Sequence, residues 1–172
     1  HTTLQFAVQA DQLGTGHALL QAAPIFQGCQ GTLVVLSGDV PLVRADTLQR
    51  LVTAHESAGA ALTVVTAKLA RPYGYGRIVR TEGRLSGIVE ERDASDTQRQ
   101  LKEINSGIYA FDLEPLFDAL LDVPRAGTVN EIYLPELVTV YRRRGLPVET
   151  VTVSDPDEVR GINSQTELAE VG

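Results

Sequence analysis

The sequence predicts an α/β fold built on an open, mostly parallel sheet. Two observations lead to this prediction: β-favouring apolar stretches alternate with amphipathic helical stretches across residues 3–68, and the connections between them are short. That order is typical of parallel strands joined by right-handed crossovers. The chain has 172 residues, of which 43% are hydrophobic, and this suffices for one domain with a full core.

Three elements are expected in the first 36 residues. Residues 3–9 alternate between polar and β-favouring apolar side chains and predict a strand. Residues 17–26 predict a helix, and Thr15, between two glycines just before it, has the hydroxyl of a helix N-cap. The apolar run at residues 32–36 predicts a buried, central strand.

The end of this central strand is the first candidate for chemistry. The apolar run stops at Ser37-Gly38-Asp39, and Pro41 cannot continue a ladder because proline has no backbone donor. Open α/β sheets bind their ligands beyond the carboxyl ends of the strands. We therefore expect the Asp39 carboxylate to lie at the ligand-binding rim of the sheet.

The remaining elements are predicted from apolar periodicity and turn residues. Residues 45–58 are amphipathic and residues 61–68 favour a strand, which completes a β-α-β-α-β order. Further on, Glu82-Gly83 predicts the turn of a hairpin, while Pro115 and Gly145 mark a helix start and a helix end. The expected later elements are strands at 77–80, 85–91, 104–111 and 148–153, helices at 113–121, 135–144 and from 165 onward, and a loop or short helix at 93–102.

Composition excludes several classes of function. The formal net charge is -7 and no long basic tract is present, which argues against nucleic-acid binding because that binding depends on cations at the phosphates. No apolar run is long enough for a bilayer, and no signal-peptide pattern is present. The single cysteine, Cys29, excludes an internal disulfide and fits a reducing cytoplasm. An acidic chain that binds a polyphosphate is expected to need a divalent cation.

Most of the polar candidates also have an ordinary structural explanation. Asp39 can be a turn former, Asn105 and Asn163 can satisfy backbone groups at the ends of strands and loops, and the Gly-Thr-Gly stretch at residues 14–16 can be a simple strand-to-helix turn. Glu90 is harder to explain in this way because it lies within an apolar strand. Its position on the period of that strand predicts a carboxylate that faces a cleft and accepts from hydroxyls.

Six motifs occur in a fixed order: QADQLGTGHA, LSGDVPL, GYGRIVR, GIVEERDA, EINSGIYAF and EVRGIN. Together they resemble the uridyltransferase domain of bacterial bifunctional N-acetylglucosamine-1-phosphate uridyltransferases, the GlmU family, from Phe6 to Ile162 and into the last predicted helix. The resemblance implies a Rossmann-like, mostly parallel sheet of the nucleotide-diphospho-sugar transferase type with a small β-hairpin lobe. It also implies one domain over 1–172, with a nucleotide-binding part at 1–70 and a sugar-binding part at 71–172.

The resemblance assigns residues to the nucleotide and to a metal ion. Gln9, Gly14 and Thr15 match the positions that contact the uracil. Asp39 and Asn163 match the pair that binds the essential Mg²⁺, and Asp39 thereby also faces the nucleotide. Two oxygen ligands suit Mg²⁺, which takes its other ligands from water and phosphates.

The sugar side of the site is assigned in the same way. Gly76, Glu90 and Asn105 match the positions that hold the N-acetylglucosamine group. Glu90 would accept from sugar hydroxyls, Asn105 would both donate and accept, and Gly76 would let the backbone approach the ligand closely.

The family reaction implied by these motifs joins UTP and N-acetylglucosamine 1-phosphate into UDP-N-acetylglucosamine and pyrophosphate. The sugar phosphate attacks the α-phosphorus in line, so positioning and charge neutralisation dominate catalysis. The resemblance thus implies a cytoplasmic, Mg²⁺-dependent enzyme that supplies precursors of peptidoglycan and lipopolysaccharide.

The chain also departs from the family pattern. The first strand and the glycine-rich loop, whose arginine and lysine bind the triphosphate in the family, have no counterpart in this sequence, and neither has the acetyltransferase half through which an oligomer would form. We therefore expect an N-terminally incomplete domain that is weak or inactive alone. Where the family has Thr-Asp and a nearby glutamine, this chain has Pro135-Glu136 and Val129, which leaves the sugar specificity open.

Three alternatives remain at this point. The first is that the chain is another sugar-1-phosphate nucleotidyltransferase, one that uses a different base or hexose. It can instead be a catalytically inert fragment that binds a UDP-sugar. A purely structural domain is disfavoured because packing alone does not call for a polar residue at each strand end.

Overall fold

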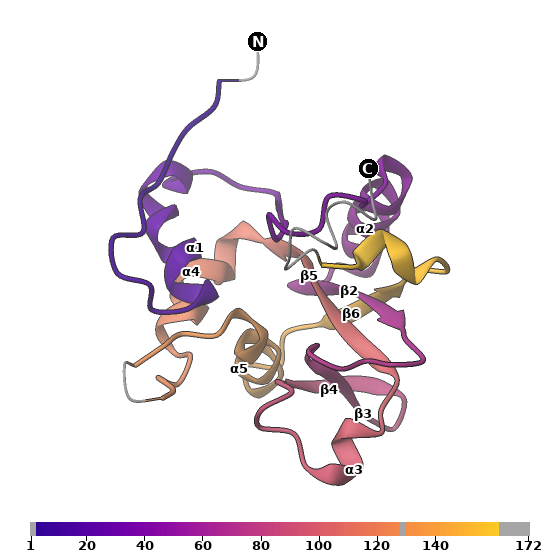
Figure 1. Cartoon of the computed structure of the whole chain (residues 1–172). Helices are drawn as coiled ribbons and strands as arrows, with labels where there is room; N and C mark the ends of the chain where they lie inside the picture. The colour runs from indigo at the N-terminus through magenta and orange to yellow at the C-terminus, as the bar shows by residue number, and fades with distance from the viewer. Residues whose placement is uncertain (1–2, 128–129, 162–172) are drawn as a thin grey trace.

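A six-stranded sheet organises the chain, with strand order β4-β3-β5-β2-β6 and with β1 paired to β5 (Figure 1). The computed structural model describes residues 3–127 and 130–161. The strands are β1 (Thr32–Val35), β2 (Leu62–Lys68), β3 (Arg77–Thr81), β4 (Arg84–Val89), β5 (Glu103–Asp112) and β6 (Val148–Thr152). The helices are α1 (Thr15–Gln21), α2 (Ala45–Ala58), α3 (Asp96–Arg99), α4 (Leu113–Leu121) and α5 (Leu137–Arg143), with 3-10 turns η1 (Ala23–Phe26), η2 (Leu134–Glu136) and η3 (Pro156–Val159).

Helices cover the sheet on two faces, because the strands alternate their apolar side chains between two cores. On β5, Ile104 and Ile108 pack into one core together with Leu51 of α2. Tyr109 and Phe111 of the same strand pack into the other core, which α4 and α5 close. This gives the α/β fold that the sequence predicts. Within the described ranges, no helix has the length and apolar character that crossing a bilayer requires.

The two best predicted helices owe their limits to clear end signals. Helix α2 has Asp46 in its first turn, where a carboxylate favours the helix dipole, and stops at Gly59, whose φ of 56° is left-handed. Helix α4 begins after Asp112, whose side chain accepts from the Glu114 backbone N–H at 3.2 Å. Both helices have the predicted bounds.

The prediction of a mostly parallel sheet is wrong in its pairing. Among the described strands, only β2 and β6 pair in parallel; the other pairings are antiparallel. The cause is β5, which lies between β1 and β2 and runs opposite to both. Strands β1, β2 and β6 still share one direction, as the Rossmann-like prediction requires.

Two strand predictions near the N-terminus also fail. Strand β1 was expected to be central and buried, yet in the described residues it pairs with β5 alone and its four residues are half-buried. Residues 3–9 were expected to form a strand but have no regular secondary structure, and Leu4, Phe6 and Val8 are about 80% exposed or more. No strand lies beside this segment within the described residues, so it has no ladder to join; Figure 1 shows it running away from the sheet.

The helix predicted at 17–26 is divided into α1 and η1, because Pro24 cannot continue the hydrogen-bond pattern of α1. The N-cap is Gly14 and not Thr15, which is the first helical residue. The helix predicted at 135–144 begins in the same way with a proline-containing turn, η2, before α5. The last predicted helix, from 165 onward, lies outside the described residues.

One edge of β5 changes partner in the middle of the strand. Near its start Ile104 pairs with Arg77 of β3, and from Tyr109 onward the strand pairs with β1. Between these two ladders lie the residues Asn105, Ser106 and Gly107, and Gly107 has a φ of 77°. The sheet is therefore open at this edge, and the candidate site is built here.

Candidate functional site

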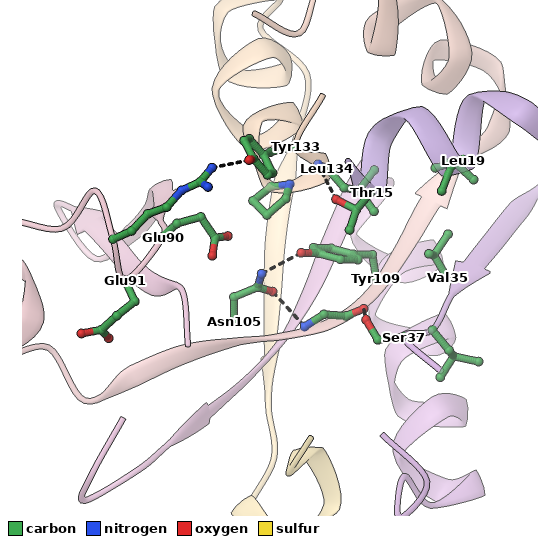
Figure 2. A pocket seen from close by; sticks show the side chains of 15 residues that line it. Thr15, Leu19, Val35, Ser37, Glu90, Glu91, Asn105, Tyr109, Tyr133 and Leu134 are labelled. Carbon is green, nitrogen blue, oxygen red and sulfur yellow. Dashed lines mark hydrogen bonds between the residues drawn. The ribbon is translucent and has the colours of Figure 1, made fainter. Parts of the chain in front are cut away.

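Two cavities meet at the open edge of β5. The first has a volume of about 600 Å³ and extends from Thr15 of α1 to Glu90 after β4 (Figure 2). The second has a volume of about 300 Å³ and reaches Asp39 and Gly76. The side chains or backbones common to both walls are those of Ser37, Glu90, Asn105 and Gly107.

Asn105 is held from three sides and lies in the wall between the two cavities. Its side-chain nitrogen donates to the Tyr109 hydroxyl at 2.7 Å, and its side-chain oxygen accepts from the Gly107 backbone N–H at 3.1 Å. Its own backbone N–H donates to the Gly76 carbonyl at 2.9 Å. The amide orientation is therefore fixed, and one N–H of the amide remains for a ligand.

Gly76 leaves just enough room for two of the predicted sugar-binding side chains. A Cβ atom at Gly76 would lie 3.3 Å from Glu90 Oε1 and 3.6 Å from Asn105 Cβ. Glu90 is half-buried, and burial raises the pKa of its carboxyl while nearby Arg92 opposes that rise. Figure 2 shows the Glu90 carboxylate on the same side as Asn105 and Tyr133, whereas Glu91 points the other way.

The close approach of β1 to β5 brings Asp39 to the second cavity. The Ser37 hydroxyl donates to the Gly107 carbonyl at 3.3 Å, and a Cβ atom at Gly107 would lie only 2.6 Å from the Ser37 hydroxyl oxygen. Gly107 thus permits a contact that a side chain would prevent. Asp39 follows in an exposed turn, as expected from the strand end that precedes it.

The Asp39 carboxylate at this cavity is the kind of oxygen donor that a hard cation such as Mg²⁺ prefers. In the described part of the chain, no group of three or more His, Cys, Asp or Glu side chains is placed to bind a metal. Asp39 supplies one carboxylate, and its predicted partner Asn163 lies outside the described residues. Mg²⁺ is commonly held by one or two protein oxygens, with water and substrate phosphates completing its shell.

The segment that precedes Asn163 lies against the same cavity. The Gly161 backbone N–H donates to the Tyr75 hydroxyl at 3.2 Å, and both residues line the cavity with Asp39. Glu158 is buried; it accepts from the Thr47 hydroxyl of α2 and lies 3.7 Å from the Arg44 guanidinium. These contacts fasten the C-terminal segment to α2 as far as the described residues extend.

The Gly14-Thr15-Gly16 stretch connects α1 to the segment that precedes α5. The Gly16 N–H donates to the Ile132 carbonyl at 2.8 Å, and the Thr15 hydroxyl accepts from the Leu134 N–H at 3.0 Å. A Cβ atom at Gly14, whose φ is 93°, would lie 2.5 Å from the Ile132 carbonyl oxygen. The glycines therefore serve close packing here, while Thr15 keeps its hydroxyl proton for a ligand at the first cavity.

Gln9 lies beside this stretch and lines neither of the two cavities. Its side-chain nitrogen donates to the Gly14 carbonyl at 3.1 Å and lies 3.0 Å from His17 Nδ1. The structure thus brings Thr15, Glu90 and Asn105 to one cavity, and Asp39 and Gly76 to the next. It places Gln9 and Gly14 behind Thr15, and it leaves Asn163 undescribed.

Sequence reasoning missed three side chains of the first cavity: Tyr109, Tyr133 and Arg92. The Arg92 guanidinium lies over the Tyr133 ring, 4.8 Å from its centre, and donates to the Tyr133 hydroxyl. Tyr109 was detectable in principle, because it lies four residues after Asn105 on one strand and shares its face. Tyr133 and Arg92 come together only through the tertiary fold.

Comparison with known proteins identifies the family of this chain. A family model described as nucleotidyl transferase matches residues 1–132. Two relatives called bifunctional protein GlmU, from Syntrophotalea carbinolica and Pelotomaculum thermopropionicum, are each 48% identical over 97% of this chain. A third, from Streptococcus suis, is 40% identical over 96% of the chain. The chain spans only 36–37% of the length of these relatives.

A solved structure supports the same fold. A Bacillus anthracis protein assigned as a glucose-1-phosphate thymidylyltransferase superposes with a TM-score of 0.68, over 93% of this chain and 60% of that chain. The two sequences are 16% identical, so this likeness concerns the fold alone. The resemblance to GlmU proteins expected from the six motifs is confirmed by the sequence relatives. By the family match over most of its length, the chain belongs to the nucleotidyl transferase family.

Proposed function

We propose that this chain carries the uridyltransferase site of a GlmU-type protein and joins UTP to N-acetylglucosamine 1-phosphate, releasing pyrophosphate. The observation that carries the proposal is the convergence of Gly76, Glu90 and Asn105 beside Asp39. The Glu90 carboxylate, which can accept from hydroxyls, the oriented amide of Asn105 and the Asp39 carboxylate then share one cavity. The names of the relatives and the family support the same reaction class.

On the sugar side, Glu90 accepts from a sugar hydroxyl and Asn105 donates its remaining amide N–H. Tyr109 keeps the Asn105 amide in place, since its hydroxyl occupies the other N–H. Asn105 can donate this N–H toward the sugar, and its oxygen, which already accepts from the Gly107 N–H, keeps a second lone pair for a ligand. Gly76 lies between the two polar side chains and lets the ligand approach them.

On the nucleotide side, Thr15 offers a hydroxyl donor at the first cavity, with Gln9 and Gly14 behind it. We assign the uracil to this end, which lies in the nucleotide-binding part at 1–70. The sugar then lies toward the part at 71–172. Arg92 and Tyr133 close one wall of the cavity between them.

We assign Mg²⁺ to Asp39 together with Asn163. When bound, the ion would neutralise charge on the phosphates; among the described residues, no lysine or arginine lines the cavity at Asp39. The sugar phosphate oxygen forms a bond to the α-phosphorus of UTP, and the bond from that phosphorus to the bridging oxygen of pyrophosphate breaks. The residues of the chain position the reactants, and the reaction needs no covalent intermediate.

A reaction of this kind consumes soluble nucleotides, so we place it in the cytoplasm, where it supplies activated amino sugar for peptidoglycan and lipopolysaccharide. No nucleic acid or membrane is needed by the proposed site. The length of the relatives leaves room for an acetyltransferase half through which an oligomer can form.

The test is pyrophosphate release by the protein that carries this chain, measured with a panel of nucleotides and sugar 1-phosphates. The proposal expects release only when UTP, Mg²⁺ and N-acetylglucosamine 1-phosphate are all present. A preference for another base or hexose would instead show that the protein is a different sugar nucleotidyltransferase. Binding of UDP-N-acetylglucosamine without any turnover would show a binding module instead of an enzyme.

A further inference from the structure

A third, cation-rich pocket lies behind the loop that carries Gly76. Its volume is about 730 Å³, which is within the range of small-molecule sites. It has one carboxylate in its lining, that of Glu91, and five cationic side chains: Arg71, Arg77, Arg92, Arg99 and Lys102. The whole chain has a net charge of -7, so this cluster of positive side chains contrasts with the negative charge of the protein.

Arg77 is the buried member of the group. It is 2% exposed; its guanidinium donates to the Tyr75 carbonyl and, at 2.6 Å, to Glu91. Its Nε is buried and has no hydrogen-bond partner among the described residues. A buried charged group with an unused donor is costly, and an anion in the pocket would lower that cost.

The single carboxylate of Glu91 cannot neutralise all the positive side chains that line the pocket with it. Its carboxylate pairs with Arg77 at 2.6 Å and lies 3.9 Å from Arg99 Nε. The other acidic partner of Arg99 is Asp96, which is fully exposed and therefore screened by solvent. Lys102 donates to the Ala70 carbonyl at 2.9 Å and forms no ion pair with any of the described residues. Arg71 makes no ion pair within the part of the chain that the structure describes.

We propose that this pocket binds a small phosphorylated anion. Arginine forks bind phosphate oxygens in pairs, and a lysine adds a point charge, so the lining matches phosphate better than it matches a neutral ligand. The binding does not rest on the proposed uridyltransferase activity. The residues that would hold the anion, Arg71, Arg77, Arg99 and Lys102, lie in neither of the two cavities at the candidate site.

The pocket is connected to the candidate site through one loop. The Gly74 backbone N–H donates to Glu91 at 3.3 Å, and Tyr73 lines both this pocket and the cavity at Asp39. An anion that engages Arg77 and Arg99 competes with Glu91 for the same guanidinium groups. Glu91 then loosens its contact with Gly74, and the loop that ends at Gly76 responds.

The experiment titrates inorganic pyrophosphate into the 172-residue chain by calorimetry, in the presence of EDTA so that no metal bridges the probe to Asp39. The double variant Arg71→Gln/Arg99→Gln should bind at least about tenfold more weakly, as expected for the loss of charge-assisted hydrogen bonds. The matched control Arg84→Gln/Arg125→Gln removes two exposed arginines outside the pocket and should bind like the wild type.

A second measurement does not depend on any variant. Amide NMR shifts caused by pyrophosphate should centre on Gly74, Glu91 and Arg99, and inorganic phosphate and UMP, titrated in parallel, show which size of phosphate source the pocket prefers. The proposal is overturned if the wild type does not bind any of the three probes. It is equally overturned if the double variant binds as the wild type does, or if the shifts centre on Thr15 and Ser37.

Discussion

The Tyr109 hydroxyl lies 2.7 Å from the side-chain nitrogen of Asn105, and both residues are buried on one face of β5. Tyr109 belongs to the core that α4 and α5 close, whereas Asn105 lines both cavities of the site. The core therefore directly orients the amide to which we assign sugar binding. This relationship yields the first prediction.

Replacing Tyr109 by Phe removes one hydrogen bond without changing the ring. The Asn105 side chain then keeps only its hydrogen bond from the Gly107 N–H, so we expect the KM for the sugar phosphate to rise about fivefold, with little effect on the KM for UTP. Tyr141→Phe is the matched control, because the buried Tyr141 hydroxyl has no hydrogen-bond partner among the described residues. Equal KM values in the two variants would contradict the positioning role of Tyr109.

Gly76→Ala tests the close packing around the sugar. The added Cβ would lie 3.2 Å from Ile88 Cγ2 and 3.3 Å from Glu90 Oε1, so the Glu90 carboxylate has to shift. We expect weaker sugar-phosphate binding, by roughly tenfold, and an unfolding free energy lower by about 1 kcal/mol. Gly87→Ala is the control, since a Cβ there meets nothing within 4 Å. An unchanged sugar-phosphate affinity in Gly76→Ala would refute this reading.

Glu90→Gln should separate stability from binding. Burial raises the pKa of the Glu90 carboxyl above its usual value near 4.5, so the folded state holds this proton to a higher pH than the unfolded state does. Its contribution to stability is therefore present below the unfolded-state pKa and is lost as the pH rises through the folded-state pKa. We expect Glu90→Gln to gain stability relative to the wild type between pH 4 and pH 7, while it binds the sugar phosphate more weakly.

Chemical unfolding across this pH range measures the gain, and Glu149→Gln on the exposed side of β6 is the control. A stability difference between Glu90→Gln and the wild type that does not grow with pH would exclude the role of burial. A variant with full affinity would remove Glu90 from the sugar site.

The buried His55 should make the stability of the fold sensitive to acid. It is 2% exposed, its Nδ1 lies 2.9 Å from the Thr63 hydroxyl, and burial lowers the pKa of its imidazole below 6.5. The unfolded state then binds the proton more readily, so stability should fall as the pH drops below 6.5, by at most about 1.4 kcal/mol per pH unit. His55→Gln should remove this slope. The same slope in both proteins, measured by urea unfolding between pH 7 and pH 5, would disprove the assignment.

Local signals in the sequence predicted those helices and strands that end at characteristic capping or turn residues. The hairpin turn Glu82-Gly83 has positive φ at both residues, as its sequence suggests, and α2 ends at a left-handed Gly59. The direction of β5 was not predictable in this way, because apolar periodicity contains no information on which strands pair. The same limit explains the misplacement of β1 in the sheet.

The site was predictable where a polar residue breaks an apolar pattern. Glu90, which was expected within a strand and lies directly after the end of β4 at Val89, reaches both cavities, and Asp39 reaches one of them. The family motifs added Gly76 and Asn105. The roles of Tyr109 and Arg77 were missed for two reasons. An aromatic residue on a strand is usually part of the hydrophobic core, and an arginine on a strand usually points to solvent. Only the tertiary structure shows that Tyr109 orients Asn105 and that Arg77 is buried.

The most direct test of the central claim is pyrophosphate release as a function of Mg²⁺ concentration for the wild type, Asp39→Asn and Asp46→Asn in the protein that carries this chain. Asp46 is an exposed carboxylate of α2 paired with Arg44, so its variant should equal the wild type. We expect Asp39→Asn to lose about a hundredfold in kcat/KM, because it loses a charged ligand at the phosphates. Activity of Asp39→Asn within twofold of the wild type at all Mg²⁺ concentrations would contradict the account.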